Sequence, residues 1–472
     1  MVSLLLKQAR KDQLQDELGS LRTEFAAWLK GRRDGDLRKQ YMTQLNALEE
    51  LIGGALCALQ PDLDACESSL EMGEFYEKCR LLDQRVVWLR RIWQFFKDKF
   101  DQRDDERLSP VLQAADEVVW SCYRPLFESS KLLGRALKSG PAPLPFIEPL
   151  YSPEAFPIEL VPGDLKDSLV GKDFLRTYLN KLPLPVVRLP PTCVLAPWML
   201  VLIGHETGHH MQHDLDLVSW YREQVERVVG GHGGTADEAA RWKSWSQEIF
   251  ADIFSVLVMG PWAVLAMAEL ELSTAVVMLT PRPRYPAPAV RLQLLAETAT
   301  RLGTDGSAQL QSYGLDLSTL LASNSEASRD AAYLPPIISL TLGPLPLPDF
   351  PLSLAQLLAF RKEEFAERGA VRQWSAALLA QDEGRTEQTL RAPRLLASAS
   401  LLAWSELAIL PDAQNRTNLR EKLAKQAVDA ILRNHELAPR DAGPVGAAAD
   451  IGVGLAELLR QAGRNQMERE VP

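Results

Sequence analysis

The stretch Pro197-Trp-Met-Leu-Val-Leu-Ile-Gly-His205-Glu206-Thr-Gly-His209 leads from an apolar run into a pair of histidines. Proline is favoured at the first position of a helix, and the apolar run after Pro197 is in good register for a buried helix. At about 100° per residue, His205 and His209 lie one turn apart on the same face of that helix, with Glu206 one residue further round. The sequence therefore predicts a buried helix that presents two imidazoles and a carboxylate together.

The histidines of the chain are concentrated near this helix. Five of the six lie between positions 205 and 232: His205, His209, His210, His213 and His232. Two imidazoles one turn apart can hold one tetrahedral zinc ion, and a glutamate beside them can reach a metal-bound water. A catalytic zinc takes three protein ligands, so the third must come from elsewhere in the chain. Helix geometry favours solvent-facing or supporting roles for His210 and His213.

The third ligand is expected on a second helix. Thr235 and Glu238 form a capping box, so this helix is predicted to begin at residue 236 and to run to the next Gly-Pro pair. On it, Glu248 and Asp252 lie one turn apart on a face that is otherwise turned to the core. Buried carboxylates are costly unless they are paired or bound to a metal. Glu248 is therefore predicted to bind the zinc ion, and Asp252 to accept a hydrogen bond from the outer nitrogen of a ligating histidine.

His-Glu-x-x-His followed by Glu-x-x-Ala-Asp resembles the gluzincin metallopeptidases, of which thermolysin is the best-known type. The resemblance is close over about 60 residues around the two motifs and loose beyond them. It implies that His205, His209 and Glu248 are zinc ligands. It also implies that Glu206 is the general base and that Asp252 supports a ligating histidine.

Two departures from related enzymes limit the resemblance. No Gly-x-Met-Glu-Asn run is present, which argues against the aminopeptidase branch. The transmembrane helices of the membrane-embedded prenyl-protein peptidases are also missing. The run Arg284-Tyr-Pro-Ala-Pro-Ala-Val-Arg291 looks like the His-Pro…Arg loop of those enzymes, with Tyr285 in place of the histidine.

Two further residues are candidates with an open alternative. Tyr285 is either a donor of a hydrogen bond in the transition state or a tyrosine of the core. His232 lies in the run Gly230-Gly-His-Gly-Gly234. That run is either a mobile edge of the cleft, with His232 in contact with substrate, or a flexible connection.

The rest of the chain predicts helices around a short extended region. Apolar spacing predicts helices over 12–30, 36–59, 71–100 and 110–137, and again over 353–382, 392–409 and 415–434. The proline-rich stretch 140–197 contains two extended runs, 156–161 and 184–189, whose prolines suit edge strands. A second proline-rich connection covers 333–351. We therefore expect a mainly α (α+β) fold: a zincin-like peptidase core with a small edge sheet, flanked by helical domains. The expected domains are 1–138, 139–335 and 336–472.

Composition narrows the partners and the compartment. The net charge of −10 and the pI of about 5.3 argue against a general nucleic-acid binder. Five scattered cysteines without a Cys-x-x-Cys pair indicate free thiols in a reducing compartment. The longest apolar stretch, 253–268, contains Gly260-Pro261 and is too short to span a bilayer. The basic and aromatic segment 85–99 suits a core helix better than a membrane surface. A cytoplasmic protein without stable membrane insertion is expected.

These patterns favour a zinc-dependent peptidase acting on a protein or peptide. An endopeptidase is expected, because no motif that binds a terminal amine is visible, and an extended substrate could add to the strand at 184–189. The alternative is a zinc-stabilised, catalytically silent protein-interaction scaffold, for which the large helical flanks would be suited. A regulatory protease with one protein substrate is compatible with the same motif.

Overall fold

The computed structural model describes residues 2–36, 39–132, 141–149, 151–156, 184–311, 313–347, 352–381, 392–434, 440, 453–457 and 459–460. Of the predicted extended run 156–161, only Phe156 lies inside this part of the chain. The described residues are mainly helical and include one three-stranded sheet, as expected from the sequence. Among them, no helix is both long and apolar enough to cross a membrane.

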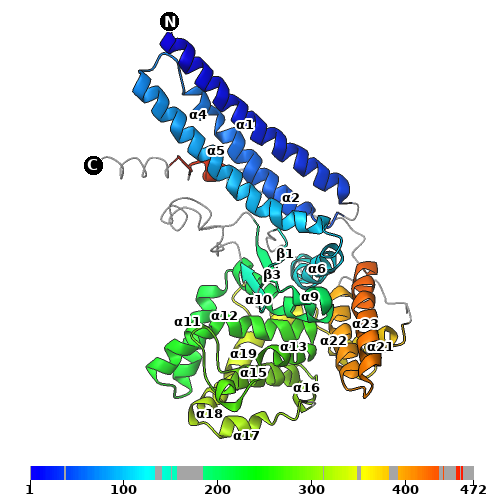
Figure 1. Ribbon diagram of the computed structural model, residues 1–472. Coiled ribbons are helices and arrows are strands. Elements are labelled where there is room, and N and C mark those ends of the chain that lie inside the picture. The colour runs from blue at the N-terminus through cyan, green and yellow to red at the C-terminus, as the bar shows by residue number, and fades with distance from the viewer. Residues whose placement is uncertain are drawn as a thin grey trace.

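The N-terminal helices form an elongated bundle that projects from the rest of the molecule (Figure 1). Its long members are α1 (Val2–Gly35) and α5 (Met72–Asp101), and between them lie α2 (Met42–Leu48), the π-helical turn η1 (Glu49–Gly53), α3 (Gly54–Ala58) and α4 (Gln60–Asp64). The aromatic side chains of α5 are buried in this bundle: Trp88, Trp93, Phe95, Phe96 and Phe100. The segment 85–99 is thus a core helix.

The sheet has the strand order β1-β3-β2, which corrects one expectation. β3 (Val186–Leu189) was predicted as an edge strand, but it lies in the centre, parallel to β1 (Leu144–Ile147) and antiparallel to β2 (Glu154–Phe156). Pro185 directly precedes the strand, so its missing N–H removes no hydrogen bond from the ladder. Within the described residues, β1 and β2 are the edge strands, and each pairs with β3 alone.

The two faces of the sheet belong to two hydrophobic cores. Leu144, Phe146 and Val186 pack into the N-terminal bundle, whereas Val187 and Leu189 pack into a second, larger core. This division follows from the alternation of side chains along a strand. The larger core also contains α6 (Ser109–Leu132), which follows the 3-10 turn η2 (Gln102–Asp104).

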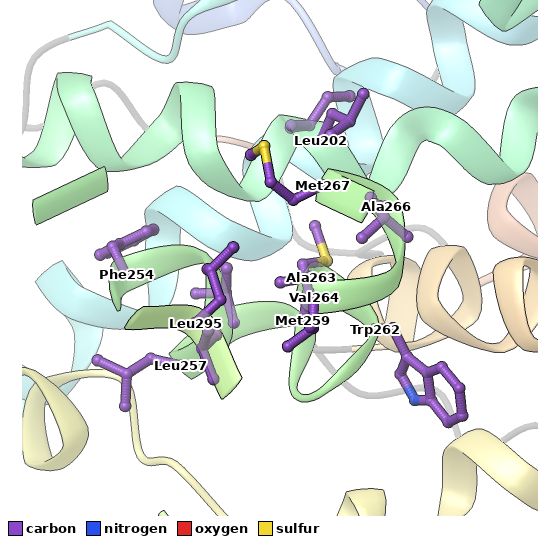
Figure 2. Close-up of a cluster of buried hydrophobic side chains, with 14 of the residues drawn as sticks. Leu202, Phe254, Leu257, Met259, Trp262, Ala263, Val264, Ala266, Met267 and Leu295 are labelled. Carbon is purple, nitrogen blue, oxygen red and sulfur yellow. The ribbon is translucent and has the colours of Figure 1, made fainter. Parts of the chain in front are cut away.

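The body of the molecule is built around the helix α12 (Ala236–Met259), which begins at its capping box as predicted. Around it lie η3 (Pro197–Leu202), α10 (Ile203–Asp214), α11 (Val218–Gly231), α13 (Trp262–Glu271) and α15 (Pro288–Arg301). The first turns after Pro197 are a 3-10 helix rather than the expected α-helix. Figure 2 shows part of the apolar core of this region, including Leu202, Phe254, Met259, Met267 and Leu295.

Smaller helices complete this body. They are α9 (Thr192–Leu195), α14 (Ala275–Met278), α16 (Ser307–Gln311), α17 (Leu317–Ala322), α18 (Ser325–Ala332) and α19 (Leu334–Leu342). The last of them corrects the expectation of an irregular connection over 333–351. Its prolines occupy the first positions of the helix, where a missing N–H costs nothing.

The C-terminal part departs from the sequence expectation once more. The single helix expected over 353–382 is divided into α20 (Leu354–Leu357), the 3-10 turn η4 (Lys362–Phe365) and α21 (Ala370–Leu379). The first break is at Ala359, which has a positive φ of 48°. The helices α22 (Ala392–Ala408) and α23 (Ala413–Arg433) follow, and α22 is buried in the larger core. That core therefore runs across the predicted domain boundaries, which remain predictions.

Candidate metal centre

Close packing of α10 on α12 positions the centre. A Cβ atom on Gly208 would lie 2.8 Å from the Cα atom of Ala251, and one on Gly204 would lie 2.8 Å from the Cγ atom of Met259. Real Cβ atoms do not approach that closely, so glycine allows the two helix axes to come together. The histidine face of α10 is thereby brought against the middle of α12.

Three predicted ligands meet at this contact. The Nε2 atoms of His205 and His209 lie 3.2 Å apart. Oε2 of Glu248 lies 3.2 Å from the first of these atoms and 3.4 Å from the second. All three side chains offer an atom within 4.8 Å of the others, and His205 and Glu248 are buried. This group could hold a metal ion.

The hydrogen bonding of His205 supports this conclusion. Its Nδ1 atom lies 2.8 Å from Oδ1 of Asp252, a distance at which the ring donates a proton to the carboxylate. In the neutral ring, Nε2 then carries a lone pair and cannot donate to Glu248. Oε2 of Glu248 has no hydrogen-bond partner within the described residues. When His205 is neutral, the lone pairs that converge in this buried place are suited to a cation.

The pKa values show how strongly this place attracts positive charge. Burial opposes the charged form of His205, but the charge of Asp252 and its hydrogen bond outweigh burial and raise the pKa of His205 to about 10. Burial also opposes ionisation of Glu248, yet His209 and His205 hold the pKa of this carboxyl well below its usual range. Without an ion, a proton on His205 balances the charge of Asp252.

A buried arginine behind the ligands was named in the sequence only as the end of the run 284–291, and its role was missed. Arg291 of α15 donates to Asp252 from Nε at 2.7 Å and from Nη2 at 2.9 Å. It also donates from Nη1 to Glu271 at 3.0 Å, and Glu271 accepts from Arg282 as well. This network fixes the carboxylate that orients His205. An arginine in the otherwise apolar start of α15 is the signal that could have revealed it.

Glu206 is buried beside the ligand group without belonging to it. Burial raises the pKa of Glu206, and the neighbouring His205 and His209 oppose that rise. Its carboxylate lines the open space above the ligands. The group is thus placed to exchange a proton with a molecule bound there.

That space consists of two adjoining cavities with shared walls. The first has a volume of about 230 Å³ and extends over His209 and His213 between β2 and α12. The second has a volume of about 150 Å³ and reaches Leu202, Met267 and Arg282. Residues 151–153 line both cavities, as do His205, Glu206 and Tyr285. An extended chain could therefore pass the ligand group from one cavity to the other.

The remaining candidates are placed as follows. Tyr285 is half-buried in the wall of both cavities, and burial and the charge of Glu248 raise its pKa to about 12. The structure does not bring His232 to the site: it is exposed at the end of α11, where Nδ1 lies 2.8 Å from the carbonyl oxygen of Val228.

The two other histidines of α10 lie outside the ligand group. His213 lines the first cavity, with Nε2 3.3 Å from Nε2 of Gln247. His210 is buried, and burial lowers its pKa well below the usual value.

Comparison of the chain with protein-family models, with curated proteins and with solved structures found no match. The likeness to the gluzincins therefore rests on the two motifs and remains a prediction.

Proposed function

We propose that the protein is a zinc-dependent peptidase with Glu206 as the general base. The observation that carries the proposal is the convergence of His205, His209 and Glu248 in a cleft that also contains a carboxylate outside the ligand group. Two imidazoles and one carboxylate are a ligand set of catalytic zinc sites, which keep a fourth position for water or substrate.

A bound zinc ion would supply Lewis-acid polarisation of the scissile carbonyl and lower the pKa of water. Glu206 accepts a proton from the attacking water and passes it to the leaving amine. Its raised pKa, caused by burial, suits a group that must both take and release a proton. Tyr285 donates a hydrogen bond to the developing oxyanion, since its own raised pKa keeps the hydroxyl protonated.

The substrate is proposed to be a protein or peptide that lies along β2. Glu154 and Ala155 of this strand line the first cavity, so the strand borders the ligand group. Adding a strand there would supply main-chain hydrogen bonds to the substrate. β2 thus takes the place of the segment 184–189 that the sequence suggested. Free thiols, four of them buried, are in keeping with action in the cytoplasm.

The substitution Glu206→Gln tests the mechanism. It keeps the shape of the side chain and removes the group that accepts the proton. General-base catalysis contributes about 10²–10⁴-fold, so cleavage of unfolded protein, followed by mass spectrometry, should fall by at least about 10². Elemental analysis should find one zinc per chain in both proteins.

The same experiment separates the peptidase from a zinc-held scaffold. A scaffold has no use for Glu206, and its Gln variant would match the parent in every assay. His205→Ala serves as the matched control, because it should lose both the metal and the activity. Absence of zinc in the parent after gentle purification, with no uptake on addition, would overturn the proposal as a whole.

A further inference from the structure

Among the described residues, three arginines border the cleft, and two of them are neutralised by carboxylates. Arg291 is buried and paired with Asp252 and Glu271. Arg282 is paired with Glu271 as well. Because these charges balance within the wall of the second cavity, neither guanidinium is a free cation for a ligand.

Arg284 differs from these two. It lines the first cavity, and 69% of its side chain is exposed. Within the described residues its one carboxylate neighbour is Glu248, whose Oε1 lies 3.7 Å from Nη2 of Arg284. Glu248 is a metal ligand in the proposed function, so its charge is taken by the ion. Arg284 is then left as a cation at the mouth of the cleft.

The opposite wall does not cancel this charge. Glu154 on β2 lies 3.6 Å from Arg188, and Arg188 lies 3.1 Å from Glu148. Lys99 lies 3.5 Å from Glu148, so this row of ion pairs contains two acids and two bases among the described residues. Inside the cavity, a divalent ion would balance Glu206 and Glu248. Among the described residues, and with such an ion bound, the net charge facing a substrate in the first cavity is positive.

The first cavity also offers polar groups beside Arg284. Gln247 on α12 and His213 on α10 line the same space, with their nitrogens 3.3 Å apart. An amide and an imidazole can both donate hydrogen bonds to a carboxylate oxygen. The space is about 230 Å³, which is large enough for an extended backbone with one side chain.

We propose that Arg284 is a specificity residue, and that the peptidase prefers an acidic side chain in the substrate segment held by the first cavity. This inference rests on the proposed function and names its substrate class. An exposed ion pair contributes modestly, which corresponds to about a fivefold preference for an acidic over a neutral side chain. The preference should shrink at high salt, because exposed charges are screened.

The first test uses peptides built around a bond that the wild-type protein cleaves in unfolded protein. The peptides of one set are identical except at a single position near that bond. That position carries Asp, Asn or Lys. The wild type should show kcat/KM in the order Asp, Asn, Lys at one of these positions. Arg284→Gln should remove the difference, Arg284→Glu should reverse it, and Arg284→Lys should keep it. Zinc content is measured for each variant, since Arg284 lies beside Glu248.

Arg227→Glu is the matched control. Arg227 is an exposed arginine of α11 that is paired with Glu223 and lines neither cavity. This variant makes the same change in net charge and should keep the wild-type order. A reversal by Arg227→Glu equal to that by Arg284→Glu would show a general charge effect and overturn the role of Arg284.

The second test measures binding without turnover. Fluorescently labelled Asp, Asn and Lys peptides are titrated with the Glu206→Gln protein, and anisotropy should give Kd values in the same order. Adding Arg284→Glu to this protein should reverse the order. Equal Kd values for the three peptides, with equal rates in the wild type, would contradict the inference and leave the peptidase intact. No cleavage by the wild type of any peptide or unfolded protein would instead contradict the peptidase itself.

Discussion

At the scale of the residue, the two ring nitrogens of His205 have different roles. Nδ1 is held by Asp252 at 2.8 Å, and Nε2 points to the place shared with His209 and Glu248. Arg291 fixes Asp252 in turn, so the orientation of the imidazole is set before any ion binds. Such support beyond the ligands typically changes metal affinity by about 10–100-fold.

The protonation of His205 gives a prediction about pH. Its pKa is about 10 in the folded, metal-free protein, against an ordinary value of 6.5. This raised pKa stabilises the metal-free fold fully below about pH 6.5, and the contribution is lost as pH rises toward 10. Zinc needs the neutral ring, so uptake at pH 8 should release about one proton from this histidine.

Calorimetric titration of zinc into metal-stripped protein, in two buffers of different ionisation enthalpy, measures that release. His205→Ala should abolish the signal together with most of the affinity. An apparent binding enthalpy that is the same in both buffers would show that His205 carries no proton before the metal binds.

At the scale of the element, the contact between α10 and α12 makes the centre. The proposed ligands come from both helices, and the distances among them depend on how closely the helix axes approach. At Gly208 the nearest neighbour is the backbone of Ala251, which cannot move aside as a flexible side chain would.

Gly208→Ala should therefore push the two helices apart. Overpacking of this kind costs about 1–3 kcal/mol, and zinc affinity should fall together with stability, although no ligand is changed. Urea unfolding and a zinc titration measure the two effects. Gly19→Ala is the control: it lies within α1 with open space around it, and alanine there should be neutral or stabilising. Unchanged zinc affinity in Gly208→Ala would mean that the ligand distances do not depend on this contact.

At the scale of the whole molecule, the bundle and the body are joined by buried charges as well as by the sheet. Arg103, at the end of the bundle, donates to both oxygens of Asp116 on α6, at 2.8 Å from Nη2 and 3.1 Å from Nε. The Tyr41 hydroxyl donates to the same carboxylate at 2.8 Å. The side chains of Arg103 and Asp116 are 5% and 2% exposed. α6 also packs on α10, the helix that contains His205 and His209. Through Asp116, α6 therefore connects the N-terminal bundle with a helix of the candidate metal centre.

Asp116→Ala should leave a buried guanidinium without its partner. Breaking a buried pair on one side costs about 3–5 kcal/mol, which urea unfolding would show as a lower midpoint. Zinc content in the absence of urea should be unchanged, since no ligand is touched. Glu223→Ala, which breaks the exposed pair with Arg227, should cost less than about 1 kcal/mol. Equal shifts of the urea midpoint in the two variants would show that the buried Arg103–Asp116 pair contributes no more to the free energy of unfolding than the exposed pair.

The sequence by itself determined the features that depend on neighbours along the chain. The capping box at Thr235 placed the start of α12, and helical spacing placed His205 with His209 and Glu248 with Asp252. Such features need one turn of helix or one cap, so the relevant residues lie within a few positions of each other. The meeting of these two pairs was inferred from a motif and a burial argument, and the structure places them together.

Only the tertiary structure decided the relations between distant segments. The central position of β3 depends on β1 and β2 on its two sides, and the pairing of Arg291 with Asp252 joins two helices. The break at Ala359 likewise goes against a continuous amphipathic pattern. Local periodicity reports which face of an element is buried and carries no information about what covers that face, because the covering segment is chosen by packing across the whole chain.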